Sequence, residues 1–450
     1  LGAITLDYRG IKGMATALGH APAAGLVSAA AGSVLSIAEA LTNIVWAPLT
    51  DGLKSVSLSA NWMWPCRNPG EDARLYEAVE AASDFAIALG INIPTGKDSL
   101  SMTQKYPDGV VYSPGPVIIT SAAEVDDIRA IVGPVLRNDP SMPLFYIDMS
   151  SMRHTLGGSA LGQTLGSLGT EAPTVSDASY FADVFGALQE MISGKMIVAG
   201  HDISAGGMIT TLLEMCFANR EGGLALNFSE IGEDDTVRLL YSQNPGVIIQ
   251  VAEESEAEEF LLERGITFVS IGHPVKERKI FVGNGAERHN FDIDHCRSHW
   301  YRSSFLLDRR QSDPQLAAER YENHGSMALE FNLKDFKGSH SSLGITPDRK
   351  TRTGARAAII REKGVNGDRE MAYALWLAGF DVKDVHMTDL ISGRETLDEI
   401  NMIVFVGGFS NSDVLGSAKG WAGAFRYNEK ARLALENFYR RDDTLSLGVC

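Results

Sequence analysis

The sequence predicts an α/β protein that ends in a doubly wound parallel sheet. Between Gly354 and Cys450, strand-like apolar runs alternate with helical runs across short turns. This pattern is typical of a parallel sheet whose ligands bind at the carboxyl ends of the strands. The composition agrees with a globular fold, because 44% of the 450 residues are hydrophobic and 22% are charged. These values exclude a disordered or fibrous chain.

The same reading along the whole chain gives four regions. We expect a first domain over 1–127, a second over 128–297, a polar linker over 298–353 and the parallel-sheet unit over 354–450. The expected strands are 1–6, 56–60, 117–122, 144–148, 195–199, 246–251, 267–271, 357–361, 382–386, 402–406 and 445–449. The expected helices are 71–89, 177–192, 207–219, 255–264, 368–378 and 428–441. The helix over 71–89 follows a Pro-Gly turn and begins with two acidic residues, which stabilise the positive end of a helix.

Charge and hydropathy narrow the possible partners. Lys and Arg total 40 against 57 Asp and Glu, a net charge of −17, which argues against nucleic acid as the main partner. The stretch Leu18–Ala38 has no charged residue, but it consists mostly of Ala, Gly and Ser. Such a segment packs backbone close to backbone and gains little from lipid, so it favours a buried helix over a membrane span.

The cysteines and the two ends of the chain suggest the setting. Cys66, Cys216, Cys296 and Cys450 form no Cys-x-x-Cys pair, which favours a reducing, cytoplasmic location over a disulfide framework or a zinc site. No secretory signal is visible. Because the sequence begins and stops within strand-like runs, we expect it to be part of a longer polypeptide.

Glu39 and Asn43 are the first candidate ligands. They lie four residues apart, so on a helix they share one face. A carboxylate in a small, uncharged helix needs a partner when it is buried, and oxygen ligands from Glu and Asn suit Mg²⁺. On spacing alone, a solvent-facing polar pair is the favoured alternative.

The segment His201-Asp202-Ile203-Ser204 follows an apolar strand and precedes two glycines and a helix. Backbone N–H groups at the start of a helix attract anions, and glycines allow a phosphate to come close. Asp202 can then hold a metal ion that bridges to this phosphate, and Ser204 can donate a hydrogen bond. The alternative is an ordinary Asp or Ser N-cap with a glycine turn.

Two other segments are weaker candidates. We interpret Thr95–Ser99 as a loop in which Lys97 can contact a nucleotide and Asp98 a metal ion, although an ordinary charged turn fits equally well. This segment lacks the glycine spacing of a Walker A loop. Gly158, Gly162 and Gly166 recur every four residues, which favours a small-residue helix seam over a phosphate loop.

The last unit carries a possible nucleophile. Cys450 ends the final strand-like run, where a following helix start makes a thiol more acidic and able to attack a carbonyl. Backbone N–H groups of the Gly407-Gly408 turn can stabilise the resulting oxyanion. A buried Cys without chemistry is the simpler explanation for a single cysteine.

Taken in order, these motifs resemble the phosphoribosylformylglycinamidine synthase family in its large single-chain form with a fused glutaminase. The resemblance spans essentially the whole chain. The matching segments are Glu-Ala-Leu-Thr-Asn at 39–43, Leu-Ser-Ala-Asn-Trp-Met at 58–63, Pro-Gly-Glu-Asp-Ala at 69–73, Gly-Lys-Asp-Ser-Leu-Ser-Met at 96–102, Leu-Gly-Gly-Ser-Ala-Leu at 156–161, His-Asp-Ile-Ser at 201–204, Gly-Gly-Phe-Ser at 407–410, Asp-Val-Leu-Gly at 413–416 and Leu-Gly-Val-Cys at 447–450.

The resemblance implies an ATP- and Mg²⁺-dependent amidotransferase of purine biosynthesis. The family converts formylglycinamide ribonucleotide and glutamine to formylglycinamidine ribonucleotide and releases ADP and phosphate. The implied fold is the second synthetase half, of the aminoimidazole-ribonucleotide-synthetase type, followed by the start of a class I glutaminase domain. The first half of the same polypeptide would then be a missing partner that holds most of the catalytic synthetase site.

The resemblance also assigns roles to individual residues. It implies metal ligands at Glu39, Asn43 and Asp202, with a nucleotide contact at Ser204, in an auxiliary site that retains ATP or ADP. A further family aspartate would lie immediately before Leu1. The glutaminase nucleophile falls on Cys450 and the oxyanion loop on 407–412, including Gly408. Many members have Tyr-Gly where this chain has Asn411-Ser412.

Alternatives from other classes remain. A small-molecule kinase of the same synthetase superfamily would transfer phosphate by itself, and a non-catalytic scaffold would serve only assembly. The triad His and Glu of the family would lie after Cys450, so the resemblance implies that this chain alone neither hydrolyses glutamine nor completes the synthesis.

Overall fold

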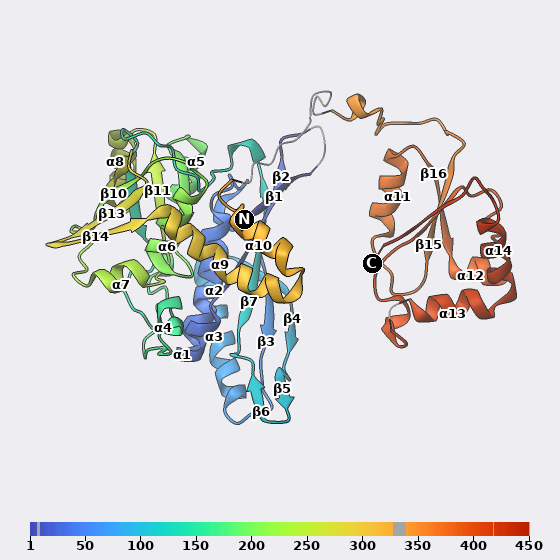
Figure 1. Cartoon of the computed structure of the whole chain (residues 1–450), viewed down its shortest axis with the longest axis horizontal. Helices are drawn as coiled ribbons and strands as arrows, with labels where there is room; N and C mark the ends of the chain where they lie inside the picture. Colours follow the sequence, from blue (N-terminus) through green and yellow to red (C-terminus); the bar gives the residue numbers. More distant parts are fainter. Residues whose placement is uncertain (7–9, 327–338, 417, 450) are drawn as a thin grey trace. The chain divides into compact units, whose positions relative to one another are not determined.

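The computed structural model describes residues 1–6, 10–326, 339–416 and 418–449 (Figure 1). The chain divides into two compact units, residues 1–328 and 329–450, and each is described here by itself. Among the described residues, no helix has both the length and the apolar character that crossing a membrane requires.

The first unit begins with a five-stranded sheet. Its strands, in spatial order, are β1 (Gly2–Thr5), β2 (Gly13–His20), β7 (Val117–Val125), β3 (Ser57–Met63) and β4 (Asn92–Ser99). A separate hairpin consists of β5 (Thr103–Tyr106) and β6 (Gly109–Tyr112). Helix α2 (Ala29–Ile44) packs on β2 and β7, and α3 (Glu71–Leu89) packs on α2. The expected helix over 71–89 is confirmed.

The uncharged stretch Leu18–Ala38 is only partly the expected buried helix. Its first residues complete β2, a short helix α1 (Pro22–Val27) follows, and α2 begins after the N-cap Ser28. The hydroxyl of Ser28 accepts a hydrogen bond from the N–H of Ala31, which starts the new helix in a separate direction. Within α2 nearly every residue is buried, as expected.

The second sheet of this unit has seven strands with mixed directions. In spatial order they are β14 (Glu287–Asp292), β13 (Lys279–Asn284), β10 (Gly223–Asn227), β12 (Val269–Val275), β8 (Leu144–Asp148), β11 (Gly246–Val251) and β9 (Ile197–Asp202). Its helices are α4 (Ala160–Thr164), α5 (Ala178–Ser193), α6 (Gly207–Phe217), α7 (Thr236–Tyr241) and α8 (Glu254–Glu263).

The two faces of this sheet belong to different cores. Val247, Ile249 and their neighbours join a core that also contains α2, α5 and α8, whereas Ile248 lies in a core with α6 and α7. All six residues of β11 are therefore buried, as expected for a strand covered on both faces. The core around α2 and α5 is continuous between the first and second sheets.

Gln189 of α5 holds the segment that follows α2 in place by hydrogen bonds. Its side-chain oxygen accepts a hydrogen bond from the N–H of Leu49 at 2.8 Å, and its amide nitrogen donates to the carbonyl of Ala47 at 3.0 Å and to that of Val45. One buried side chain thus satisfies three backbone groups of the segment that follows α2.

After the second sheet the chain is helical. Helices α9 (Ile293–Gln311) and α10 (Pro314–Glu322) pack on one another, and α9 also packs on α6. A short 3-10 turn over His340–Leu343 follows in the described part.

The second unit is the expected parallel sheet, in the order β16 (Asp381–His386), β15 (Arg356–Arg361), β17 (Met402–Phe405) and β18 (Leu445–Gly448). All three pairings are parallel. The helices are α11 (Asp368–Leu377), α12 (Met387–Ser392), α13 (Lys419–Tyr427) and α14 (Glu429–Tyr439). Helix α11 covers one face and the other three cover the opposite face, which makes the sheet doubly wound (Figure 1).

Three expectations about local structure were incomplete or wrong. The segment Thr95–Ser99 is not a loop but part of β4, an exposed edge strand whose polar side chains resemble those of a turn. Strand β2 was missed because its inward residues are small, which removes the hydrophobic alternation that marks a strand. The hairpin of β13 and β14 was also missed, although Gly285 at its turn has a positive φ of 53°.

We predict that Gln189→Leu destabilises the first unit by about 2–4 kcal/mol, because the buried Leu49 N–H and two carbonyls lose their only side-chain partner and cannot reach water. Urea unfolding measures the loss. Gln104→Leu, at an exposed position of β5, is the matched control and should change stability by less than about 0.5 kcal/mol. Equal stability of the two variants would show that Gln189 does not fasten the core.

Candidate functional site

Glu39 and Asn43 share one face of α2, as their spacing predicts, and this face meets β2. The carboxylate Oε2 of Glu39 accepts a hydrogen bond from the backbone N–H of His20 at 2.8 Å. The side-chain amide of Asn43 donates to the backbone carbonyl of Leu18 at 3.2 Å. Strand β2 therefore fixes both polar groups by hydrogen bonds. The two residues are half-buried, unlike the solvent-facing pair of the alternative prediction.

The close approach of α2 to β2 depends on Gly19. A Cβ atom at this position would lie 2.1 Å from the carbonyl oxygen of Ser36 and 2.3 Å from the backbone nitrogen of Ala40. No side chain fits there, because backbone atoms cannot move aside as the end of a flexible side chain can. The Ala, Gly and Ser content of α2 therefore has the expected physical meaning of backbone-to-backbone packing.

Asp202 is the last residue of β9, and its side chain is almost completely buried, with 3% of the residue exposed. Among the described residues, no donor lies within hydrogen-bonding distance of its Oδ2. The alternative reading of Asp202 or Ser204 as an N-cap is wrong, because α6 is capped by Gly206 with φ +94° and without a side-chain hydrogen bond. A buried carboxylate oxygen without a partner is costly, so a ligand is the simplest explanation.

His201 lies beside Asp202 and uses both ring nitrogens. Nδ1 is 3.2 Å from Asp202 Oδ1, and Nε2 is 3.1 Å from Glu214 Oε2. Burial alone would lower the pKa of His201, but the hydrogen bonds to the two carboxylates and their charges outweigh it and raise the pKa to about 10. His201 is therefore an imidazolium at neutral pH.

A cavity of about 250 Å³ opens where α1, α2 and the loop after β9 meet. Glu39 and Ser204 both line it, together with Gly157, Gly158 and Gln243. Asn43 and Asp202 do not line it. When its side-chain amide is oriented to satisfy its neighbours, the oxygen of Gln243 accepts from the N–H groups of Ala160 (2.7 Å) and Gly206 (3.0 Å), which joins the two glycine-containing loops of the cavity.

The glycine series at 158, 162 and 166 is not a helix seam. Helix α4 has five residues, and both Gly158 and Gly166 lie outside it with positive φ. A Cβ at Gly158 would lie 2.4 Å from the Cα of Ala24, so this glycine lets the loop touch α1 at the edge of the cavity. Each of the three positions requires a backbone conformation or a close approach that only glycine permits, but only Gly158 lines the cavity.

The electrostatics connect Glu39 with Asp202. Burial raises the pKa of Glu39 to about 7, the hydrogen bond from His20 opposes the shift, and the charge of Asp202 adds to it. The two carboxylates, 163 positions apart in sequence, are thus close enough for their charges to interact. A cation at this place would favour the ionised form of Glu39.

The residues fit a divalent cation through their chemistry. Oxygen donors from Glu39, Asn43 and Asp202 suit Mg²⁺, which keeps several water or phosphate ligands. The unpartnered Oδ2 of Asp202 is the observation that favours such an ion. Among the described residues, no group of three or more His, Cys, Asp or Glu side chains is arranged to hold a metal ion, so phosphate or water would have to complete the ligand set.

Lys97 and Asp98 lie apart from this cavity. Both are exposed on β4, where the Nζ of Lys97 is 3.0 Å from the hydroxyl of Ser99. Neither residue lines the cavity that contains Glu39 and Ser204.

In the second unit, the Gly407-Gly408 turn follows β17 at the carboxyl end of the sheet. Gly408 has φ +109°, and a Cβ there would lie 2.8 Å from the backbone nitrogen of Asn366. The predicted nucleophile Cys450 lies outside the described residues. The residue before it, Val449, donates from its N–H to the carbonyl of Phe405 at 2.9 Å, so the ends of β17 and β18 lie together.

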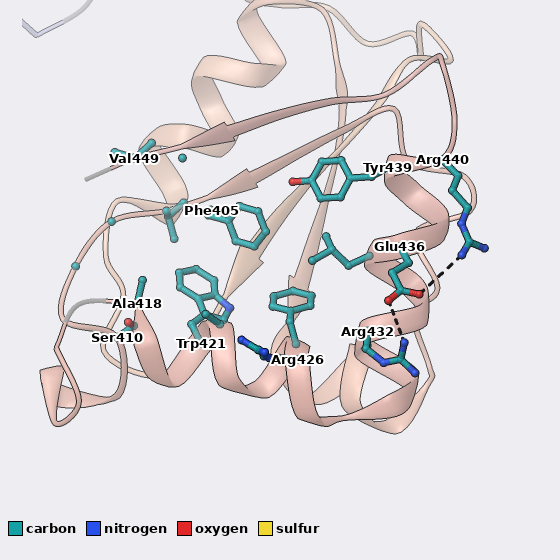
Figure 2. Close-up of a pocket in the computed structure, with 17 residues that line it drawn as sticks. Phe405, Ser410, Ala418, Trp421, Arg426, Arg432, Glu436, Tyr439, Arg440 and Val449 are labelled. Carbon is teal, nitrogen blue, oxygen red and sulfur yellow. Dashed lines mark hydrogen bonds and ion pairs between the residues drawn. The ribbon is translucent and has the colours of Figure 1, made fainter.

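A larger cavity of about 1,070 Å³ is lined by these strand ends and by α13 and α14. Figure 2 shows the aromatic side chains of Phe405, Trp421 and Tyr439 along its wall. Glu436 lies at its rim between Arg432 at 3.0 Å and Arg440 at 4.0 Å. The cavity is mainly apolar, and its charged side chains are Arg426, Arg432, Glu436 and Arg440.

Sequence reasoning missed three residues of the first site: Glu214, Gln243 and Trp300. Glu214 lies within α6 and reaches back to His201, while the indole of Trp300 donates to Glu214 from α9. No local motif marks these contacts, because they join elements 13 to 86 positions apart. The one available signal was His201 itself, whose direct neighbour is an expected metal ligand.

Fold and site together define an α/β synthetase-type unit followed by a glutamine amidotransferase-type unit. Residues 2–124 match the family model described as the FGAR-AT PurM_N-like domain, and residues 149–283 match the C-terminal domain of AIR synthase related proteins. Residues 354–450 match the CobB/CobQ-like glutamine amidotransferase domain.

Comparison with curated proteins confirms the resemblance to phosphoribosylformylglycinamidine synthase. The Homo sapiens enzyme of that name is 38% identical over 461 residues, which cover 99% of this chain and 34% of that protein. The probable chloroplastic or mitochondrial enzyme of Arabidopsis thaliana is 36% identical and covers 99% of this chain and 32% of that protein. The chain thus spans about a third of the length of the curated relatives it matches.

The fold comparison agrees. The solved structure described as T. maritima PurL complexed with FGAR matches 65% of this chain and 47% of that chain, with a TM-score of 0.53 and 13% identity. A second structure, phosphoribosylformylglycinamidine synthase II from Thermotoga maritima, gives a TM-score of 0.51 at 12% identity over 65% of this chain and 45% of that chain. These likenesses confirm the expected fold class.

We predict that Gly19→Ala destabilises the first unit by about 1–3 kcal/mol, because the new methyl group collides with the backbone of α2 and moves Glu39 away from the N–H of His20. Denaturant unfolding measures the effect. The matched control is Gly186→Ala inside α5, where a Cβ meets nothing within 4 Å and alanine should raise stability by about 0.5–1 kcal/mol. Destabilisation of both variants to the same extent would contradict the role of Gly19.

Proposed function

We propose that this chain is part of an ATP- and Mg²⁺-dependent amidotransferase of purine biosynthesis. The enzyme replaces the amide oxygen of formylglycinamide ribonucleotide with nitrogen from glutamine and forms formylglycinamidine ribonucleotide, ADP and phosphate. Similarity along 99% of the chain to proteins named phosphoribosylformylglycinamidine synthase supports the proposal. T. maritima PurL structures described as complexes with FGAR and with ATP support the substrate classes.

The chemistry explains why two kinds of unit occur on one chain. An amide oxygen is a poor leaving group, and its phosphorylation by ATP makes it one that departs as phosphate. Ammonia released from glutamine must meet the activated substrate before it is protonated or lost to water. A glutaminase unit joined to a synthetase unit satisfies this requirement, which neither a free kinase nor a scaffold needs.

For the first unit we propose an auxiliary site that retains ATP or ADP with Mg²⁺. Glu39, Asn43 and Asp202 would hold the ion, and Ser204 would donate a hydrogen bond to a phosphate oxygen. The observation that carries this proposal is the buried, unpartnered Oδ2 of Asp202 next to a loop that lines the cavity with Glu39. When bound, the cation would neutralise the phosphates and both carboxylates.

For the second unit we propose Cys450 as the glutaminase nucleophile and Gly408 as part of its oxyanion loop. In sequence Cys450 directly follows Val449, and β18 pairs with β17, after which the glycine turn begins. The positive φ of Gly408 allows the turn to present backbone N–H groups, which stabilise an oxyanion better than side chains that must first be oriented.

The proposal includes the domain division and the location. We divide the chain into 1–127, 128–297, a linker over 298–353 and 354–450. The first half of the same polypeptide would be the partner of this part, and no nucleic acid or membrane takes part. A cytoplasmic, reducing location is supported by the free thiols of Cys66, Cys216 and Cys296.

Isothermal titration of the 450-residue chain with ADP and Mg²⁺ tests the nucleotide site. We expect saturable binding with one site, at least tenfold weaker binding by Asp202→Asn and by Glu39→Gln, and no binding when Mg²⁺ is replaced by EDTA. Removing one ligand charge weakens attraction to the cation. Asp84→Asn on the exposed face of α3 is the matched control and should bind like the unchanged chain.

The same titration decides the weaker assignments. We retain Lys97 as a nucleotide contact and Asp98 as a metal ligand on their sequence pattern alone. If Lys97→Gln and Asp98→Asn bind as tightly as Asp84→Asn, these two residues are removed from the site. If the folded, unchanged chain releases no heat with ADP and Mg²⁺, the auxiliary site itself is wrong.

A further inference from the structure

A row of polar contacts leads from Asp202 to the surface helix α9. His201 contacts Asp202 on one side and Glu214 of α6 on the other, and the second oxygen of Glu214 accepts from the indole N–H of Trp300 at 3.0 Å. Four side chains from β9, α6 and α9 thus form one continuous series. None of them except Asp202 was assigned to the nucleotide site.

The geometry fixes the imidazole of His201 at both ends. Nδ1 lies 2.9 Å from the backbone carbonyl of Asp202 and 3.2 Å from its Oδ1, so this N–H is directed at the aspartate. Nε2 lies 3.1 Å from Glu214 Oε2. A ring held at both nitrogens cannot turn without losing a contact, and Asp202 Oδ1 is held with it.

The two carboxylate oxygens of Asp202 therefore have different surroundings. Oδ1 forms an ion pair with His201 at 3.2 Å, while Oδ2 has no hydrogen-bond partner among the described residues. When one carboxylate oxygen of an aspartate is held in place, the other oxygen points in a fixed direction. A side chain that binds a cation needs such a fixed direction. Without His201 the carboxylate could rotate, and both oxygens would compete for the same place.

Further contacts hold α9, which carries Trp300, against α6. The ring of Trp300 meets that of Phe217 edge-on, with centroids 6.0 Å apart. One turn earlier, Arg297 donates to the backbone carbonyl of Phe217 at 3.0 Å. Helix α9 therefore holds the last turn of α6, which carries Glu214, and a shift of one helix is transmitted to the other.

We propose that His201 is a positioning residue for Asp202, and that Glu214 and Trp300 extend this positioning to α9. The proposal rests on the proposed nucleotide site, whose cation Asp202 would bind. Occupation of the site would fix Asp202, His201 and Glu214, and the indole of Trp300 would sense the change. Helix α9 packs on α10, so occupation of the site would influence these two helices.

Two histidine variants separate the two contacts. Asparagine places its amide nitrogen near Nδ1 of histidine, so His201→Asn keeps a donor for Asp202 and loses Glu214. Glutamine places its nitrogen near Nε2, so His201→Gln keeps a donor for Glu214 and loses Asp202. Loss of an outer partner of a metal ligand costs about 10–100-fold in affinity. We therefore expect at least tenfold weaker Mg–ADP binding for His201→Gln and binding within threefold of the unchanged chain for His201→Asn, both measured by titration calorimetry.

The response of Trp300, the residue of the series farthest from Asp202, can be followed by ¹⁹F NMR. The chain has six tryptophans, and 5-fluorotryptophan labelling with Trp300→Phe as reference assigns the ¹⁹F resonance of Trp300. We expect saturating Mg–ADP to move this resonance in the unchanged chain and to leave it unmoved in His201→Asn at saturation. Glu214→Ala, which removes the contacts to both His201 and Trp300, is a second variant with the same expected loss of response, should His201→Asn not fold. Thermal unfolding of each variant confirms that it is folded.

The outcomes are distinct. Binding by the unchanged chain together with equal binding by His201→Gln overturns the positioning role and leaves the nucleotide site intact. A Trp300 resonance that does not move at saturation overturns the extension to α9. Absence of any binding by the unchanged chain overturns the proposed site, and the positioning role with it.

Discussion

The placement of α2 against both sheets is the constraint on which the first unit depends. Gly19 lets the backbone of α2 touch β2 at Ser36 and Ala40. Just after the helix, the buried ring of Trp46 covers β9, where a Cβ at Gly200 would lie 2.1 Å from the ring. Gln189 then holds the chain that leaves α2. Glu39 on the helix and Asp202 on β9 interact because these contacts hold α2 close to both strands.

This packing brings the carboxylates of Glu39 and Asp202 close together in a largely buried region. The like charge of Asp202 and the burial of Glu39 both favour the neutral acid at Glu39. The only cation of the described site, His201, faces Asp202 and Glu214 and leaves Oδ2 of Asp202 without a partner. A divalent ion with bound phosphate, as proposed above, would supply a second positive charge on the side of Glu39, in a cavity whose protein ligands are few.

Much of the fold could be predicted from sequence wherever hydrophobic patterns were strong. Strands β8 and β11 and helix α3 were predicted with their boundaries, because buried strands are continuous apolar runs and α3 has a turn at its start. Strand β2 could not be predicted, because its inward residues are Gly and Ala. Their small size allows the close approach of α2, a tertiary contact that the local sequence does not show. For the same reason the residue types of the site could be proposed, while the roles of Glu214 and Gln243 could not.

The second unit shows how a turn can be fixed before any substrate arrives. Asn411, Ser412 and Asp413 follow one another with φ values of 54°, 55° and 61°, a left-handed run that is unfavourable for residues with side chains. The N–H of Asn411 donates to the carbonyl of Lys363 at 2.9 Å, and the N–H of Asn366 donates to that of Gly407 at 3.0 Å. The neighbouring 363–366 segment thus compensates the strain. A loop that is held in a costly conformation keeps its N–H groups oriented without reorganisation, which is what the oxyanion role proposed above would demand.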